Sequence, residues 1–348
     1  DGLRYAHVRP FPQETTGHLM LRIFFVSLLA CGLLPVTIPA AANNLPAGDE
    51  QARDFAERMA SEHGFAAEEV RAVLADAEIK QNILDAISRP AEKTKPWHEY
   101  RKIFLTEERI DQGADFWAEH ETAIEQASAR FGVDPAMLVA IVGVETFYGR
   151  RTGSFRVLDA LATLGFRYPP RSEFFQRELE EFLLLTREQG LDPRDPKGSY
   201  AGAMGAPQFI SSSYRAYAVD GDGDGRVDLW NSWPDVISSV ANYFSVHGWE
   251  AGGPVTTRAT ARGTIDPGSG LKLDNTVGGL AEAGVRFDPA AGGKAPATLI
   301  ELEAADGPEY WVAYKNFYVI TRYNRSRLYA MAAHDLARAI SERVGQAG

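Results

Sequence analysis

Ile141-Val-Gly-Val-Glu-Thr-Phe-Tyr-Gly-Arg150 places one carboxylate, Glu145, at the end of a nearly continuous apolar run. Every residue from Met137 to Val144 is apolar or small, and Asp134-Pro135 supplies a helix N-cap and a first-turn proline. A helix that is apolar around its circumference is buried on most sides. The segment therefore predicts a core helix that ends in a carboxylate.

The position of Glu145 predicts general acid chemistry. An ionised carboxylate is costly inside a protein unless it is paired, and no basic residue lies within one turn upstream. Burial raises the pKa of a glutamate and keeps its proton available near neutral pH. The alternative is a glutamate that only reaches the solvent edge or a backbone partner at the helix end.

The hydrophobic pattern predicts a mainly α (α+β) fold for the 348 residues. Helices are expected between Asp49 and Gly132, around a linker at Ser88–Pro96. Further helices are expected over residues 159–164, 172–189, 207–218, 234–247 and 324–345. After a linker at Ala251–Pro254, strands are expected over residues 255–260, 298–302 and 310–314. The net charge of −11, with no basic block, excludes nucleic acid as a partner.

The N-terminal region resembles an export signal. Met20-Leu-Arg22 precedes an apolar stretch to Val36, and Ala40-Ala-Ala42 offers small residues for cleavage before Asn43. This pattern predicts a periplasmic protein, with residues 1–42 outside the fold. Cys31, the only cysteine, loosely fits a lipoprotein box, so lipid anchoring is the less favoured alternative. In either case no disulfide stabilises the mature chain.

Gly198-Ser-Tyr-Ala-Gly-Ala-Met-Gly-Ala-Pro-Gln-Phe-Ile210 is a loop of small residues. Small side chains let a backbone approach a bulky ligand, and Gln208 can form a hydrogen bond with an amide or hydroxyl group. A tight connection between helices is the alternative. Asp195 and Asp220 flank the loop, and no acidic residue lies between them. If the loop faces Glu145, the polar side chains that it offers are only Ser199 and Gln208. An ordinary glycosidase needs a second carboxylate.

Asp220-Gly-Asp-Gly-Asp-Gly-Arg-Val-Asp228 has the spacing of a calcium loop. Positions 1, 3, 5 and 7 would be filled by Asp220, Asp222, Asp224 and the carbonyl of Arg226. Asn231 replaces the glutamate at position 12, so Asp235 is expected to supply the missing ligand. We expect one structural Ca²⁺ and no organic cofactor. A solvated acidic turn is the alternative, and no histidine pair has the spacing of a catalytic zinc site.

Six segments together resemble bacterial lytic murein transglycosylases of the B type (glycoside hydrolase family 103), in order from about Asp49 to the C-terminus. They are residues 142–149, 158–164, 198–209, 241–244, 247–249 and 320–326. The resemblance implies a lysozyme-like helical catalytic core with an additional helical domain and a small β domain. The boundaries expected are 43–130 for the N-terminal helical region, 131–250 for the core with the calcium loop, 251–318 for the β region, and 319–348 for a C-terminal helix completing the site.

The same resemblance implies cleavage of the β-1,4 bond between N-acetylmuramic acid and N-acetylglucosamine in peptidoglycan, with 1,6-anhydromuramic acid ends. Glu145 would be the single acid and base, and the substrate's N-acetyl group would support the positive charge at the sugar. Matching family positions implied to bind substrate are Tyr100, Ser199, Gln208, Tyr243, Tyr323 and Asn324.

Two positions depart from the family pattern. Tyr168-Pro-Pro-Arg171 stands where the family commonly has two arginines, so Arg171 alone would contact the peptide stem or lactyl carboxylate. The calcium loop carries one extra residue before Asp235. Glycan strands are the expected partner of a monomeric enzyme, with other cell-wall enzymes as candidate partners. The alternatives are a hydrolytic muramidase and a non-catalytic, calcium-stabilised peptidoglycan-binding protein.

Overall fold

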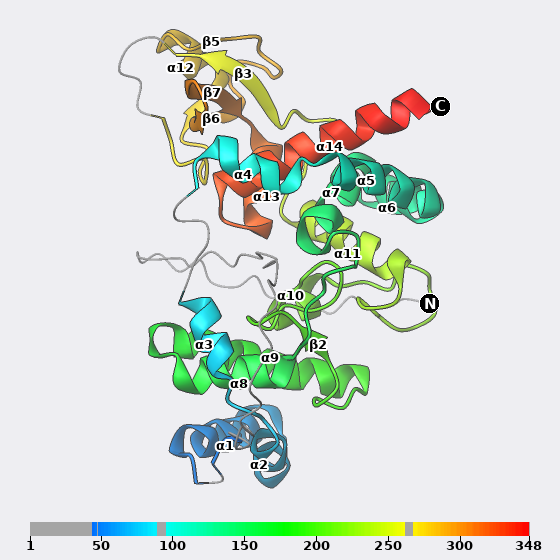
Figure 1. Cartoon of the computed structure of the whole chain (residues 1–348), viewed down its shortest axis with the longest axis vertical. Coiled ribbons are helices and arrows are strands. Elements are labelled where there is room, and N and C mark those ends of the chain that lie inside the picture. Colours follow the sequence, from blue (N-terminus) through cyan, green and yellow to red (C-terminus); the bar gives the residue numbers. More distant parts are fainter. Residues whose placement is uncertain (1–43, 47, 89–94, 262–266, 348) are drawn as a thin grey trace, which may run out of the picture.

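The computed structural model describes residues 44–46, 48–88, 95–261 and 267–347 (Figure 1). The expected export signal and Cys31 lie outside these residues. The helices before the sheet are α1 Glu50–His63, α2 Ala67–Ala75, α3 Gln81–Ile87, α4 Trp97–Phe104, α5 Glu107–Glu119, α6 Glu121–Phe131, α7 Pro135–Thr146, α8 Val157–Arg167, α9 Ser172–Gln189, α10 Ser211–Tyr217 and α11 Trp233–Val246. The later helices are α12 Val277–Glu282, α13 Lys315–Tyr323 and α14 Arg327–Ala347.

The helix that carries Glu145, α7, lies in the centre of the core, as its composition predicts. Asp134 caps its start by accepting a hydrogen bond from the backbone amide of Ala136 at 2.8 Å. Every residue from Ala136 to Val144 is buried. The neighbours α14, α5, α6 and α11 pack against α7 and explain the absence of a polar face.

Helices α1, α2, α3, α8 and α9 occupy the end of the molecule away from the sheet (Figure 1). The long pair α8 and α9 pack along each other, and α1 and α2 form a hairpin beside them. Two short strands, β1 (Phe155–Arg156) and β2 (Lys197–Gly198), pair antiparallel next to this group. Since β2 leads into the small-residue loop, this pairing fixes where that loop begins.

The β region is a five-stranded antiparallel sheet of order β4-β6-β7-β3-β5 at the opposite end of the molecule (Figure 1). Its strands are β3 Thr256–Thr260, β4 Asn275–Thr276, β5 Arg286–Phe287, β6 Pro296–Ala304 and β7 Gly307–Ala313. A small apolar cluster of its own, including Val277, Leu299 and Val312, lies under the sheet. The helical majority with one small sheet confirms the predicted fold class.

Two expected helix boundaries are wrong. The helix expected from Pro207 begins only at Ser211, because residues 207–210 still belong to the loop and Gln208 has a φ of 55°. The C-terminal helix expected over residues 324–345 begins only at Arg327, and a break separates it from α13, which was not among the expected helices. The break occurs at residues 324–326, where the amide of Ser326 bonds to the carbonyl of Asn324 at 2.7 Å. Helical periodicity does not reveal such a break because both halves are amphipathic.

Candidate active site

A strained turn holds Glu145 at the end of α7. Phe147 and Tyr148 follow it with φ values of 51° and 58°, a left-handed conformation that costs a non-glycine residue about 1–3 kcal/mol. Thr146 donates from its hydroxyl to the carbonyl of Ala206 at 2.9 Å and accepts from the amide of Gly149 at 3.1 Å. The turn therefore ties Glu145 directly to the small-residue loop.

Glu145 is half-buried and carries a raised pKa. Burial raises the pKa of its carboxyl group to about 7, and a hydrogen bond from the Tyr329 hydroxyl at 2.5 Å lowers it in part. Among the described residues no second carboxylate contributes to this pKa. A carboxyl group of this kind is protonated in a useful fraction of molecules at neutral pH and can both donate and recover a proton.

Aromatic side chains surround Glu145. Burial and the charge of Glu145 raise the pKa values of Tyr323 and Tyr329 well above 10, so both hydroxyls stay protonated. Tyr323 donates to the carbonyl of Pro207 at 2.6 Å, and its ring lies 4.9 Å from that of Tyr243. Tyr100, buried on α4, is also close enough to affect Tyr329. Tyr323 and Tyr329 thus lie beside the carboxylate, with Tyr243 and Tyr100 next to them.

The small-residue loop is held by very close backbone approaches. A Cβ atom at Gly198 would lie 2.1 Å from the carbonyl oxygen of Ala203, so only glycine fits there. The buried Ser199 hydroxyl accepts from the amide of Ala203 at 3.0 Å. Gln208 donates its amide hydrogens to Thr152 and Gly205 carbonyls at 3.0 and 2.8 Å.

That arrangement leaves the Gln208 side-chain oxygen buried without a hydrogen-bond partner among the described residues. An unpaired buried acceptor is unfavourable by about 1–3 kcal/mol unless a ligand supplies a donor. Gln208 therefore has a free acceptor, and its role in ligand binding stays a prediction.

Two further predicted residues are Asn324 and Arg171, and no contact of Arg171 with Glu145 is seen among the described residues. Asn324 follows α13 directly as its C-cap residue. Arg171 ends a 3₁₀ turn, and its guanidinium lies 4.1 Å from the ring centre of Phe174 on α9. The prediction missed Tyr329, which lies 184 positions after Glu145. Its place on an apolar helix face gave no signal that distinguishes it from an ordinary core residue.

The calcium loop brings three carboxylates together. Ligand atoms of Asp220, Asp222 and Asp235 lie within 4.8 Å of one another, whereas Asp224 is not part of this group. Asp235 is 1% exposed, and burial together with Asp222 and Asp220 raises its pKa. Carboxylates that lie this close and repel one another fit a site for a hard cation. The carbonyl of Arg226 lies in the same loop.

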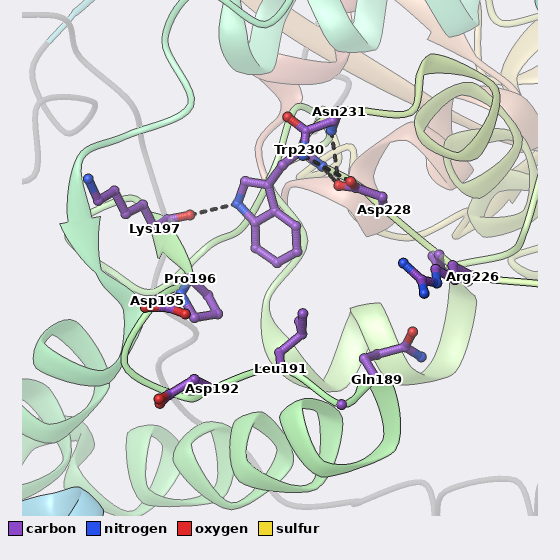
Figure 2. Close-up of a pocket in the computed structure, with 12 residues that line it drawn as sticks. Gln189, Leu191, Asp192, Asp195, Pro196, Lys197, Arg226, Asp228, Trp230 and Asn231 are labelled. Atoms are coloured by element: carbon purple, nitrogen blue, oxygen red, sulfur yellow. Dashed lines mark hydrogen bonds between the residues drawn. The ribbon is translucent and has the colours of Figure 1, made fainter.

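The calcium loop also supports the small-residue loop. The Leu229 carbonyl accepts a hydrogen bond from the amide of Ala206 at 2.9 Å, and the Trp230 indole donates to the Lys197 carbonyl at 2.8 Å. Figure 2 shows Trp230 in a cavity of about 740 Å³ between the end of α9 and the calcium loop. Glu145 does not line this cavity. The cavity lies between residues 189–197 and residues 226–231, and it is separate from the candidate active site.

No single helix in the described part of the chain is long and apolar enough to cross a membrane. The pair α6 and α7 passes that test together, but the two are bent by 114° at their junction. Helix α7 is the buried core helix described above.

A family model described as the transglycosylase SLT domain matches residues 47–338. The chain belongs to the transglycosylase SLT family. It is 41% identical over 304 residues to membrane-bound lytic murein transglycosylase B of Escherichia coli (strain K12), covering 85% of this chain and 84% of that protein. The resemblance to the B-type lytic transglycosylases is confirmed.

Two solved structures support the same membership. Lytic transglycosylase SltB1 of Pseudomonas aeruginosa superposes with a TM-score of 0.81 at 48% identity, covering 86% of this chain and 99% of that one. Escherichia coli lytic transglycosylase Slt35, solved in complex with calcium, superposes with a TM-score of 0.78 at 40% identity. The match covers 85% of this chain and 94% of that one. Within this transglycosylase family, Glu145 and its aromatic surroundings form the candidate active site.

Proposed function

We propose that this protein is a lytic transglycosylase that cleaves the β-1,4 bond between N-acetylmuramic acid and N-acetylglucosamine in peptidoglycan. The observation that carries the proposal is the single carboxyl group of Glu145, with a pKa of about 7 and no second carboxylate contributing to that pKa among the described residues. One group that titrates near neutrality can act first as an acid and then as a base.

In the first step, protonated Glu145 gives its proton to the glycosidic oxygen, and the bond from that oxygen to C1 of the muramic acid breaks. The N-acetyl group of the same sugar stabilises the positive charge that develops at C1. In the second step, ionised Glu145 takes the proton of the C6 hydroxyl as its oxygen bonds to C1. The product is a 1,6-anhydromuramic acid end, and no water is consumed.

Substrate contacts follow from the geometry of the surrounding side chains. The unpaired oxygen of Gln208 is suited to accept a hydrogen bond from an N-acetyl N–H group. Ser199 holds the loop around that acceptor. The rings of Tyr100, Tyr243 and Tyr323 offer apolar faces for pyranose rings, and Asn324 and Arg171 add polar contacts at the margins.

For the metal site, Asp220, Asp222 and Asp235 supply carboxylates for one Ca²⁺, with the Arg226 carbonyl as a further ligand and Asp224 in an outer position. A relative solved in complex with calcium supports this assignment. Bound Ca²⁺ would neutralise the carboxylates and stiffen residues 220–235. Because Leu229 and Trp230 brace the small-residue loop, we assign the ion a structural role.

The domain division proposed is the one expected from the sequence, with boundaries near residues 130, 250 and 318. Export to the periplasm places the enzyme beside its substrate, and the name of the Escherichia coli relative supports a location at the cell wall. We propose a monomer that acts on glycan strands.

Mass spectrometry of fragments released from purified sacculi tests the proposed reaction. We expect 1,6-anhydromuramic acid ends; reducing muramic acid ends would instead establish a hydrolytic muramidase. Glu145→Gln should release no fragments yet still sediment with sacculi. Glu178→Gln is the matched control, because Glu178 on α9 is also buried with a raised pKa but accepts its hydrogen bond from Ser212 on α10. Release by Glu145→Gln, or none by the wild type, would contradict the proposal.

A further inference from the structure

Helix α13 carries a positively charged surface beside Tyr243 and Tyr323 of the candidate active site. The Lys315 ammonium lies 5.2 Å and the Arg322 guanidinium 4.4 Å from the ring centre of Tyr318. Within the described chain, neither cation forms an ion pair with a carboxylate, although the protein has 47 acidic side chains against 36 lysines and arginines. We call Lys315, Tyr318 and Arg322 the cationic face.

Arg322 is half-buried without a counter-ion. Burial lowers the pKa of its guanidinium, the nearby Arg325 lowers it further, and no described carboxylate opposes them. Its Nε atom is buried and has no hydrogen-bond partner in the described part of the chain. By contrast, the partly buried Arg215 is paired with both Glu181 and Glu188. A half-buried cation without an anion is unfavourable, so the site is suited to an anionic ligand.

His247 lies beside the cationic face and brings no negative charge to it. His247 stacks on the Tyr243 ring at 4.1 Å and bonds through Nδ1 to the Tyr243 carbonyl at 2.7 Å. Burial, and then the charges of Arg322 and Lys315, lower the pKa of His247. The imidazole is therefore less readily protonated than a free histidine, and the charge of the cationic face comes from Lys315 and Arg322.

The cationic face continues directly from the residues proposed to bind sugar. The Tyr243 hydroxyl donates to the Arg322 backbone carbonyl at 2.7 Å, and Tyr323, whose pKa responds to Glu145, is the next residue of the helix. A glycan bound along Tyr243 and Tyr323 therefore places its substituents beside Lys315 and Arg322. In peptidoglycan, the substituents that carry free carboxylates are the peptide stems.

We propose that Lys315 and Arg322 bind the carboxylates of a peptide stem and so give the enzyme a preference for peptide-bearing glycan strands. This inference rests on the proposed function. The planar guanidinium of Arg322 is suited to a carboxylate, and it has no ion pair among the described residues. Lys315 adds a second charge one and a half to two helical turns away on the same side of α13.

The test compares peptide-bearing glycan chains with the same chains stripped of peptide by an amidase, whose freed lactyl carboxylates are then converted to amides. Arg322→Gln and Lys315→Gln should each raise KM for peptide-bearing chains about 10-fold, or about 1.4 kcal/mol, with kcat unchanged. KM for stripped chains should stay within twofold of the wild type. Arg338→Gln is the matched control, because Arg338 is an exposed cation of α14 that pairs with Glu342 at 3.5 Å.

A third substrate, with its stem carboxylates converted to amides, should make the wild type behave like the variants. Equal losses on stripped and peptide-bearing chains would overturn the proposal and show a structural role, and so would unchanged KM values on both. If Arg322→Gln fails to fold, Lys315→Gln and the amidated substrate still decide the outcome. A wild type that cleaves neither kind of chain would refute the proposed function itself, which is a separate result.

Discussion

Replacing Tyr329 with phenylalanine should shift the pH dependence of the enzyme to higher pH. The Tyr329 hydroxyl donates a 2.5 Å hydrogen bond to Glu145, and this bond favours the ionised carboxylate and lowers its pKa. A hydrogen bond to a charged group contributes about 1.5–3 kcal/mol. At about 1.4 kcal/mol per pH unit, its loss raises the pKa by roughly 1–2 units, from about 7 to about 8–9.

The sign of the shift follows from the role of Glu145 as an acid in the first step. Activity falls as pH rises through its pKa, so a higher pKa moves the alkaline limb of kcat/KM upward. The assay is kcat/KM on soluble glycan chains between pH 5 and pH 10. The maximum should also fall, because the hydroxyl orients the carboxyl group.

Tyr323→Phe provides the matched control, since its hydroxyl binds the Pro207 carbonyl at 2.6 Å. The alkaline limb of kcat/KM for the Tyr323→Phe variant should stay near pH 7. A Tyr329→Phe limb that remains at the wild-type position, or moves to lower pH, would refute this account of the Glu145 pKa.

Three further predictions concern stability. The pKa of Glu145, about 7 against an ordinary 4.5, means that its ionisation above pH 7 costs the folded state up to about 3 kcal/mol. Thermal unfolding of Glu145→Gln should therefore show a higher Tm than the wild type at pH 8 but no gain at pH 4; a gain at both would point to another cause. EDTA should lower the wild-type Tm by several degrees and leave that of Asp235→Asn unchanged, as measured by scanning calorimetry; an equal drop in both would exclude Asp235 as a ligand. In urea unfolding, Gly143→Ala should lose about 1–3 kcal/mol, because its Cβ would lie 2.6 Å from the Tyr148 hydroxyl, whereas Gly48→Ala meets nothing within 4 Å and should be neutral.

Local patterns in the sequence were enough to predict the elements whose signals are contiguous. The apolar run before Glu145 predicted a buried helix, and α7 is buried on nearly every side. The strand-forming residues of 298–302 and 310–314 located β6 and β7, and helix α9 was predicted at both ends. The aspartate spacing indicated a candidate cation site because calcium loops draw most ligands from one short segment.

Only the tertiary structure decided which side chains surround Glu145. Tyr329 reaches it from another helix, and Tyr323 is placed by the break between α13 and α14. Asp235 joins Asp220 only because α11 folds back over the loop. That Arg322 forms no ion pair among the described residues could likewise be recognised only after the neighbouring carboxylates had been located. Helical and strand periods describe which face of an element is buried, but they carry no information about which distant element covers it.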